Sequence, residues 1–206
     1  MVKLYDFAIS GNCHKARLML SLLGLEYELI PVNQQAGEHK SEMFLKLNPL
    51  GQVPVLIDGD VVIRDSQAIL VYLARRYGGE DWLPVEAEPL SKVMQWLSFA
   101  ANEIQNSFAA ARRHFLLNAQ LDVDLAQQKA YQTLQILNAH LSDRQWLECV
   151  SEALAQEVRP TIADIACFPY VGLAADSKIS LADYAHINGW SERIKQLPGY
   201  VSMPGL

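Results

Sequence analysis

The stretch Gly51–Ser66, GQVPVLIDGDVVIRDS, constrains the fold of this chain more than any other. Two short β-branched runs, Val53–Ile57 and Val61–Ile63, flank Asp58-Gly59, a pair that favours a tight hairpin turn. The pair Asp65-Ser66 then precedes an apolar helix, and the free N–H groups at a helix start suit a carboxylate. The stretch therefore predicts a strand, a turn, a strand and a helix, with room for a small ligand at both ends.

The residues before this stretch add a strand–helix–strand unit. Val2–Phe7 and Tyr27–Val32 are typical of strands, and apolar residues at helical spacing between them predict a helix over 13–23, which Gly24 ends. A unit of this length predicts parallel strands. With the hairpin, it predicts an α/β domain over residues 1–77, built as a four-stranded mixed sheet with helices packed on it.

The character of the chain changes after Gly78-Gly79, and we place a linker over residues 78–89. Beyond it no strand pattern recurs. Apolar residues at helical spacing predict long helices over 90–117 and 123–141, so residues 90–206 are expected to form an all-α helical bundle domain.

One helix start in this second half is clearly marked. Thr161 stands three residues before Asp164 and ahead of an apolar run, which predicts a capping box. On the usual capping scale, Asp164→Ala then costs about 1 kcal/mol or more. This role is structural.

Composition excludes several functional classes. The net charge of −6, without a basic face, argues against a nucleic-acid partner. Apolar stretches end well before the roughly 18 residues that span a bilayer, and no secretory signal opens the chain, so a cytoplasmic location is expected. The three cysteines, at 13, 149 and 167, form no disulfide framework. Cys13 falls inside the first helix, which favours a buried structural thiol over a reactive one.

Several short motifs follow one another in an order and spacing that resemble the cytosolic glutathione S-transferase superfamily over essentially the whole chain. They are Leu4-Tyr5, Ser10-Gly11-Asn12-Cys13, Asn48-Pro49, Val53-Pro54, Asp65-Ser66, Thr161-Ile162-Ala163-Asp164, Trp190 and Leu197-Pro198-Gly199. The serine in the first turn is similar to that of the serine-type classes, which include theta, delta and related bacterial groups. The resemblance implies a thioredoxin-like N-terminal domain, an all-helical C-terminal domain, a cis Val53-Pro54 bond and usually a homodimer.

The resemblance also implies a site that ionises the thiol of glutathione. Ser10 would donate a hydrogen bond to the sulfur, Asn12 is the second candidate, and the N-terminus of the first helix would add a favourable field. Two alternatives stay open: Ser10 caps the helix and does nothing else, or Tyr5 supplies the hydroxyl. Glutathione is the co-substrate, and no metal or further cofactor is implied.

The implied glutathione-binding residues are His39, Lys40, Gln52, Val53, Pro54, Asp65 and Ser66. Ser66 would hold the γ-glutamyl carboxylate, Asp65 the α-amino group, and the backbone of Val53 the cysteinyl part. His39 and Lys40 would reach the glycine carboxylate. Simple helix capping by Asp65-Ser66 and a solvated loop at 39–40 are the competing interpretations.

An electrophile pocket is expected between the domains, with Ile9, Phe108, Arg112 and Phe115 as lining, although such side chains more often belong to a core. We therefore predict that the enzyme conjugates the thiolate of glutathione to a small hydrophobic electrophile. Glutathione-dependent reduction of peroxides or disulfides is one alternative, and a non-catalytic binding or regulatory protein is another. The segment 148–159 is longer than the short connection usual in this family and has no functional explanation.

Overall fold

The computed structural model describes residues 1–149 and 158–206. Its N-terminal part contains a four-stranded sheet in the order β2-β1-β3-β4, in which β1 and β2 are parallel and the other pairs are antiparallel. The strands are β1 (Val2–Asp6), β2 (Tyr27–Pro31), β3 (Val55–Asp58) and β4 (Val61–Arg64). The predicted mixed sheet and its parallel pair are confirmed.

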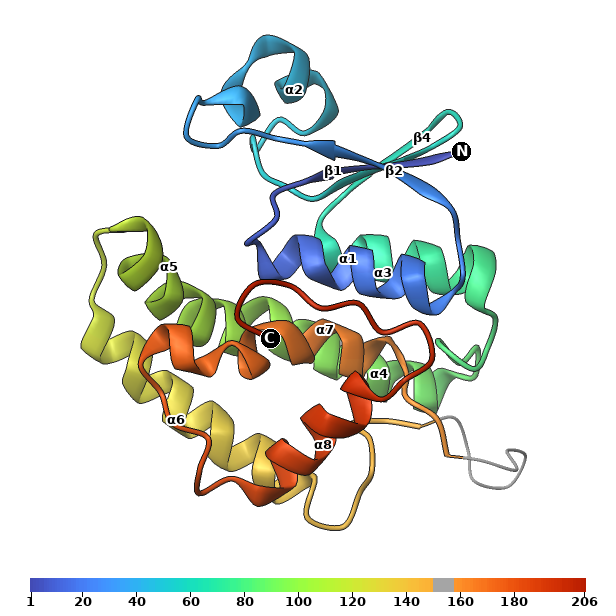
Figure 1. Ribbon diagram of the computed structural model, residues 1–206. Helices are drawn as coiled ribbons and strands as arrows, with labels where there is room; N and C mark the ends of the chain where they lie inside the picture. Colours follow the sequence, from blue (N-terminus) through green and yellow to red (C-terminus); the bar gives the residue numbers. More distant parts are fainter. Residues whose placement is uncertain (150–157) are drawn as a thin grey trace.

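Helices cover both faces of this sheet (Figure 1). They are α1 (Gly11–Leu22), the short 3₁₀ turn Glu38–Lys40, α2 (Glu42–Leu47) and α3 (Ser66–Leu73), which a π-helical turn extends over Ala74–Gly78. Successive side chains along β1 point to opposite faces of the sheet. Leu4 is fully buried in the core with α1 and α3, while Tyr5 packs its ring against Phe44 of α2 at 5.8 Å.

The hairpin turn lies one residue later than predicted. Asp58 is still paired with Val61 in the ladder, so the two turn residues are Gly59 and Asp60. Gly59 has a φ of +59°, a conformation that costs glycine nothing. The hairpin itself and the helix after it are as expected.

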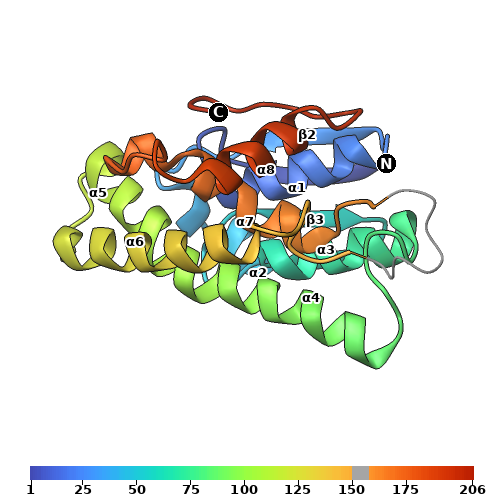
Figure 2. The ribbon, with the colours of Figure 1, turned by 90° about the horizontal axis from the view of Figure 1, so that it is seen from below.

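The C-terminal part is helical. Its elements are α4 (Ala87–Phe99), a π-helical stretch (Ala100–Ala109), α5 (Ala110–Leu117), α6 (Val123–His140), α7 (Ile162–Gly172), a 3₁₀ turn (Ala174–Ser177) and α8 (Ala185–Lys195). The first three run on without a break, and α6 lies alongside them (Figure 2). This continuous helix begins at Ala87, three residues before the predicted start, because Pro89 sits in its first turn, where no N–H is required.

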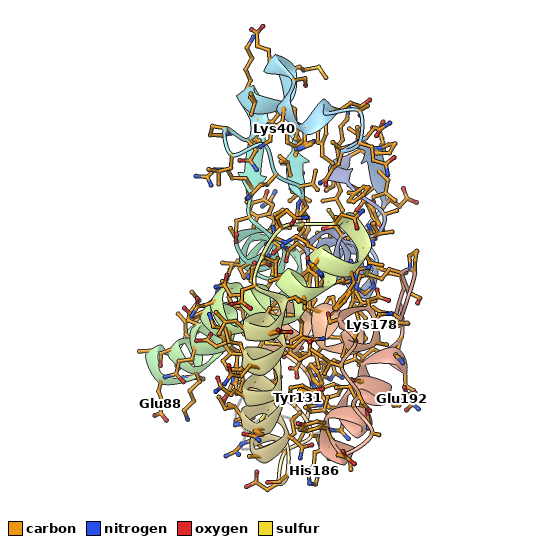
Figure 3. The ribbon with its side chains drawn as sticks, turned by 90° about the vertical axis from the view of Figure 1, so that its left-hand side faces the viewer. Lys40, Glu88, Tyr131, Lys178, His186 and Glu192 are labelled. Carbon is orange, nitrogen blue, oxygen red and sulfur yellow. The ribbon has the colours of Figure 1, made fainter. Side chains whose placement is uncertain are left out.

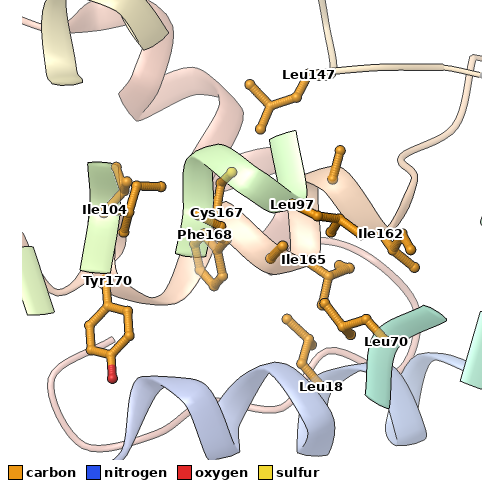
Figure 4. Packing of buried hydrophobic residues seen from close by; sticks show 14 of the residues in the cluster. Leu18, Leu70, Leu97, Ile104, Leu147, Ile162, Ile165, Cys167, Phe168 and Tyr170 are labelled. Carbon is orange, nitrogen blue, oxygen red and sulfur yellow. The ribbon is translucent and has the colours of Figure 1, made fainter. Parts of the chain in front are cut away.

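One hydrophobic core joins the two parts. Leu18 of α1 and Leu70 of α3 point toward Ile165 and Phe168 of α7, and all four side chains are fully buried (Figure 4). Helix α7 therefore lies between the sheet domain and the remaining C-terminal helices. The N-terminal end of α1 is held against this helix, which matters for the site described below.

The predicted capping box is confirmed, and its acid does more than cap. One Asp164 carboxylate oxygen accepts the backbone N–H of Thr161 at 3.0 Å. The other accepts the N–H of Leu147 at 2.9 Å and the indole N–H of Trp190 at 2.8 Å. Burial raises the pKa of Asp164 to about 6 despite these three donors. The side chain thus ties α7 to α8 and to the segment before it.

Within 1–149 and 158–206, no helix is long and apolar enough to cross a membrane. The segment 148–159, which the sequence left without an explanation, lies mostly outside the described residues. Trp146 donates its indole N–H to the carbonyl of Val158 at 3.1 Å, which closes the described ends of that segment onto each other.

Candidate active site

A cleft of about 420 Å³ opens between the sheet domain and the π-helical stretch with α5. Eleven of the residues proposed from the sequence lie in its wall: Ile9, Ser10, Asn12, His39, Lys40, Gln52, Val53, Pro54, Asp65, Ser66 and Arg112. They come from five separate segments of the chain. The fold therefore assembles most of the predicted site in one place.

Ser10 ends the loop after β1 and caps α1. Its Oγ accepts the N–H of Cys13 at 3.3 Å, and its own N–H donates to the carbonyl of Phe7 at 2.8 Å. Capping of α1 by Ser10 is thus confirmed, whereas a role limited to capping is not tested by this contact. Capping uses only an acceptor site, so the hydroxyl proton stays available to a ligand in the cleft.

Asn12 bridges the two domains. Its side-chain Nδ2 donates to Oε1 of Gln105 in the π-helical stretch at 3.2 Å, and its Oδ1 accepts the hydroxyl of Ser66 at 3.4 Å. The amide is therefore occupied on both sides. This arrangement favours Ser10 over Asn12 as the group that can turn toward a ligand.

Asp65 and Ser66 start α3 and face the cleft together. Asp65 has a φ of +75°, unusual for a residue with a side chain, and its carboxylate accepts the N–H groups of Gln67 and Ala68 at 2.9 and 3.1 Å. Ser66 is buried, and its hydroxyl also contacts Oε1 of Gln67. Capping by Asp65 is confirmed, and a strained residue at a cleft is a functional candidate as well.

The loop before β3 presents backbone to the cleft. The Val53-Pro54 peptide bond is cis, as the resemblance implied. Asn48 is buried and braces the loop: its Nδ2 donates to the carbonyl of Gln52 at 2.7 Å, and its Oδ1 accepts the N–H of Leu50 at 3.1 Å. Asn48-Pro49 was recognised only as a motif, and its bracing role could not be seen without the fold.

His39 and Lys40 form the outer end of the cleft. Lys40 donates from Nζ to the carbonyl of Leu50 at 3.0 Å, and Figure 3 labels it in the N-terminal domain, at the end of the molecule opposite Tyr131 and His186. The Nδ1 atom of His39 is buried without a hydrogen-bond partner among the described residues. One cation and one unpaired imidazole nitrogen there suit a carboxylate.

The opposite wall differs from the prediction at two positions. Phe108 is fully buried in the core, and Phe115 is partly exposed beside His114 and Lys178, away from the cleft. Phe108 lies four residues after Ile104 and so continues the buried stripe. The neighbouring stripe, one residue further round the helix, lines the cleft and comprises Ala101, Gln105 and Ala109.

Arg112 lies in this wall and is buried between the domains. Its Nη1 donates to the carbonyl of Ile9 at 2.6 Å and its Nε to Asp176 at 2.8 Å. A charge-assisted hydrogen bond to a backbone carbonyl is comparatively strong. Arg112 therefore fixes the position of the loop that carries Ser10, beyond lining the pocket.

The two other side chains considered from the sequence, Tyr5 and Cys13, do not line the cleft. Tyr5 lies against Phe44 on the other face of the sheet and does not reach the cleft. Cys13 is fully buried, and burial raises the pKa of its thiol to about 12, which matches the structural interpretation. The described residues contain no cluster of side chains able to hold a metal ion.

Sequence reasoning missed several cleft residues. They include Gln34, Arg64, Gln67, Ala101, Gln105, Ala109, Arg113 and Tyr170. Gln105 could have been identified, because it lies one residue after Ile104 and so on the helix face next to the buried one. No sequence signal connects Tyr170 of α7 to a loop near the N-terminus.

Comparison with known proteins finds relatives that match most of the chain. Residues 1–75 match the family model described as "Glutathione S-transferase, N-terminal domain". The chain is 30% identical to "Glutathione S-transferase 3" of Zea mays over 97% of this chain and 91% of that protein. It is 42% identical to "Glutathione S-transferase Z1" of Arabidopsis thaliana, a match that spans only 50% of this chain and 47% of that relative. A solved glutathione S-transferase from Pseudomonas fluorescens superposes with a TM-score of 0.88, at 32% identity and 98% coverage of both chains.

Proposed function

The chain belongs to the glutathione S-transferase superfamily, and we propose that the cleft binds glutathione with its thiol held against Ser10. The observation that carries this proposal is the convergence of Ser10, the cis Val53-Pro54 loop and the Asp65-Ser66 helix start on one cleft. These three features suit the sulfur, the peptide backbone and the charged end of one tripeptide. A glutathione S-transferase joins glutathione to an electrophile through that sulfur.

The γ-glutamyl end binds at the start of α3. Ser66 offers a hydroxyl, and the helix N-terminus offers a favourable field, both suited to the carboxylate. The carboxylate of Asp65 caps the helix through Oδ1. Its second oxygen remains to pair with the α-amino group. The unusual φ of Asp65 is what aims this side chain at the cleft.

The rest of the tripeptide extends along the loop before β3. The backbone of Val53 bonds the cysteinyl part as an added strand would, with Gln52 beside it. The glycine carboxylate reaches His39 and Lys40, whose cation and buried unpaired nitrogen support this assignment. Glutathione thus lies across the N-terminal domain from α3 to the 3₁₀ turn.

Ser10 lowers the pKa of the bound thiol. A free thiol has a pKa near 8.5, and each unit of lowering requires about 1.4 kcal/mol of preferential stabilisation of the thiolate. The hydroxyl of Ser10 donates one hydrogen bond to the sulfur, and the N-terminus of α1 adds its field. The proton leaves to solvent, so no general base is required.

The electrophile binds on the opposite wall. The small side chains of Ala101 and Ala109 leave space on either side of Gln105, and Leu116 and Leu117 add apolar surface. This wall suits a small hydrophobic electrophile.

We also propose that the protein works as a homodimer in the cytoplasm, without a nucleic-acid or membrane partner. The side chains of Val61 and Val62 are exposed on the edge strand β4, which is compatible with contact to a second copy.

A substitution at Ser66 tests the binding part of the proposal. Ser66→Ala is expected to weaken glutathione binding by roughly 1 to 3 kcal/mol, the cost of losing a hydrogen bond to a charged group. Isothermal calorimetry measures the change. Ser142→Ala is the matched control, because that hydroxyl is exposed and, among the described residues, donates only to the carbonyl of Ala139 near the end of α6. Absence of glutathione binding by the wild type would refute the proposal.

A turnover panel tests the chemistry. Aryl halides report conjugation, peroxides report peroxide reduction, and mixed disulfides report thiol transfer. Conjugation is the expected main activity, because a serine at position 10 supplies no enzyme thiol for thiol–disulfide exchange. Turnover confined to disulfides would favour the reductase alternative, and glutathione binding without any turnover would favour a binding protein.

A further inference from the structure

Arg113 is a charged side chain of the cleft wall to which the proposed function gives no role. The wall residues Ala101, Gln105, Ala109, Arg113 and Leu117 follow one another at every fourth position, along the continuous helix that runs from the π-helical stretch into α5. Residues four apart are neighbours on one face of a helix. Arg113 therefore belongs to the face that lines the cleft, between Ala109 and Leu117.

The residue before it, Arg112, fixes where along the cleft Arg113 lies. Nη1 of Arg112 donates to the carbonyl of Ile9 at 2.6 Å, and Ile9 directly precedes Ser10. In Figure 1, α5 lies on the side of the molecule where α1 begins. The turn of α5 that carries Arg113 is therefore held beside the loop that carries Ser10. A group attached to the sulfur of bound glutathione would lie near this turn.

The cleft is basic, although the chain as a whole has a net charge of −6. Its wall contains four cationic side chains, from Lys40, Arg64, Arg112 and Arg113, against one carboxylate, that of Asp65. A concave site lined mainly by one sign of charge concentrates ligands of the opposite sign. The charge of the cleft therefore favours anionic ligands.

The other cations of the cleft already have partners or lie at the glutathione end. Arg112 is paired with Asp176 at 2.8 Å. Lys40 is assigned to the glycine carboxylate, and Arg64 ends β4 beside the site proposed for the γ-glutamyl group. Arg113 is exposed, and its guanidinium has no hydrogen bond or ion pair with any residue that the structure describes. It is thus a cation on the electrophile side of the cleft that is available to a ligand.

We propose that Arg113 selects electrophiles that carry a carboxylate on a hydrophobic body, by pairing with that carboxylate across the cleft from Ser10. The proposal rests on the proposed function and names its substrate class. A guanidinium suits a carboxylate because its parallel N–H donors match both oxygens, and Ala109 and Leu117 leave apolar surface for the rest of the molecule. In the reaction the thiolate forms the new bond to carbon, and the leaving group departs with its electron pair. Arg113 keeps its proton throughout.

A surface role would also explain an arginine at this position. Helix α5 ends at Leu117, and a cation near the C-terminal end of a helix interacts favourably with the helix dipole. That role does not depend on the charge of a ligand. Discrimination between two ligands that differ only in charge therefore separates the two explanations.

Two glutathione conjugates test the pairing without any turnover. Calorimetry compares S-(4-carboxybenzyl)glutathione with its neutral carboxamide, S-(4-carbamoylbenzyl)glutathione, in the full chain. The wild type is expected to bind the carboxylate about three- to tenfold more tightly at low ionic strength, and less so as salt is added. Arg113→Met should remove this preference while changing the affinity for the carboxamide less than about twofold. Arg113→Glu should reverse the preference.

Turnover tests the same selectivity during the reaction. The electrophiles are 4-chloro-3-nitrobenzoate and 4-chloro-3-nitrobenzamide, from which chloride leaves, and each kcat/KM is divided by the rate of the uncatalysed reaction. The ratio of the two should follow the binding preference in the wild type and in both variants. Lys129→Met is the matched control, because it removes one exposed positive charge from α6, outside the cleft. This control should keep the preference of the wild type.

Failure of this inference can be distinguished from failure of the proposed function. Equal affinity of the wild type for the two conjugates, or a preference that persists in Arg113→Met, would overturn the role of Arg113 and leave glutathione binding intact. An equal loss of turnover with both electrophiles, together with a raised pKa of bound glutathione, would assign the charge to the thiolate and also overturn the inference. Binding of neither the conjugates nor glutathione would refute the proposed function and this inference with it.

Discussion

Lys15 provides the sharpest test of the physical account, because its charge is buried without a hydrogen bond or ion pair to any residue that the structure describes. The side chain of this α1 residue is fully buried, and its Nζ has no hydrogen-bond partner among the described residues. Burial lowers the pKa of Lys15 to about 8, from an ordinary value of 10.5. The protonated lysine therefore destabilises the folded state at neutral pH.

The size of this effect follows from the two pKa values. A difference of about 2.5 units corresponds to roughly 3 kcal/mol at pH 7, since each unit is worth about 1.4 kcal/mol. The contact of the ammonium with the Tyr170 ring offsets about 1 to 2 kcal/mol of the free-energy cost of burying the charge. Lys15→Met keeps a similar shape without the charge. We expect this variant to be about 1 to 2 kcal/mol more stable than the wild type at pH 7.

The dependence on pH distinguishes this explanation from better packing. Between about pH 8 and 10.5 the unfolded state binds more protons at Lys15 than the folded state, so the stability of the wild type rises with pH relative to the variant. The difference between the two proteins should shift by about 2 kcal/mol in favour of the wild type between pH 7 and 9.5. Urea unfolding at fixed protein concentration measures it, with the exposed Lys46→Met as the control. A destabilised variant, or a difference independent of pH, would refute the reasoning.

Two further stability predictions follow from buried acids. Asp164→Ala should cost about 3 kcal/mol or more, well above the roughly 1 kcal/mol of a cap alone, because it leaves the N–H groups of Thr161 and Leu147 and the Trp190 indole without their acceptor. A loss near 1 kcal/mol in urea unfolding would show that these donors find other partners. Arg17→Met should cost about 3 to 5 kcal/mol, because Arg17 pairs with the buried carboxylate of Asp6 and donates to the Ala8 carbonyl at 3.0 Å. Adding Asp6→Asn should recover part of this stability, and no recovery would contradict the ion-pair explanation.

Local signals explain why so much of the fold could be predicted. The strand–helix–strand unit, the hairpin and the capping box at Thr161 each depend on residues within a few positions of one another. Their errors are also local. The hairpin turn moved by one residue because Asp58 can pair in the ladder as well as occupy a turn, and α4 began early because a proline is tolerated in the first turn of a helix.

The wall formed by the C-terminal helices could not be predicted as well. Which stripe of a long helix faces a cleft depends on its rotation about its own axis, and the aromatic Phe108 was assigned to the wrong stripe. The π-helical stretch 100–109 adds to this, since it winds side chains at a different angle from an α-helix and has no sequence signal of its own. Gln105, which bonds Asn12, lies within it.

The loop that carries Ser10 belongs to the N-terminal domain but is held in position by side chains of the C-terminal domain. The residues proposed to anchor glutathione, from His39 to Ser66, all belong to the N-terminal domain. Three side chains of the other domain hold the loop and the start of α1: Arg112 bonds the carbonyl of Ile9, Gln105 bonds Asn12, and the ring of Tyr170 packs on Gly11. Because two of these, Gln105 and Arg112, also line the wall proposed for the electrophile, a substitution that reshapes that wall is expected to change thiol activation too. We therefore expect substrate range and thiol pKa to be coupled through the same few residues.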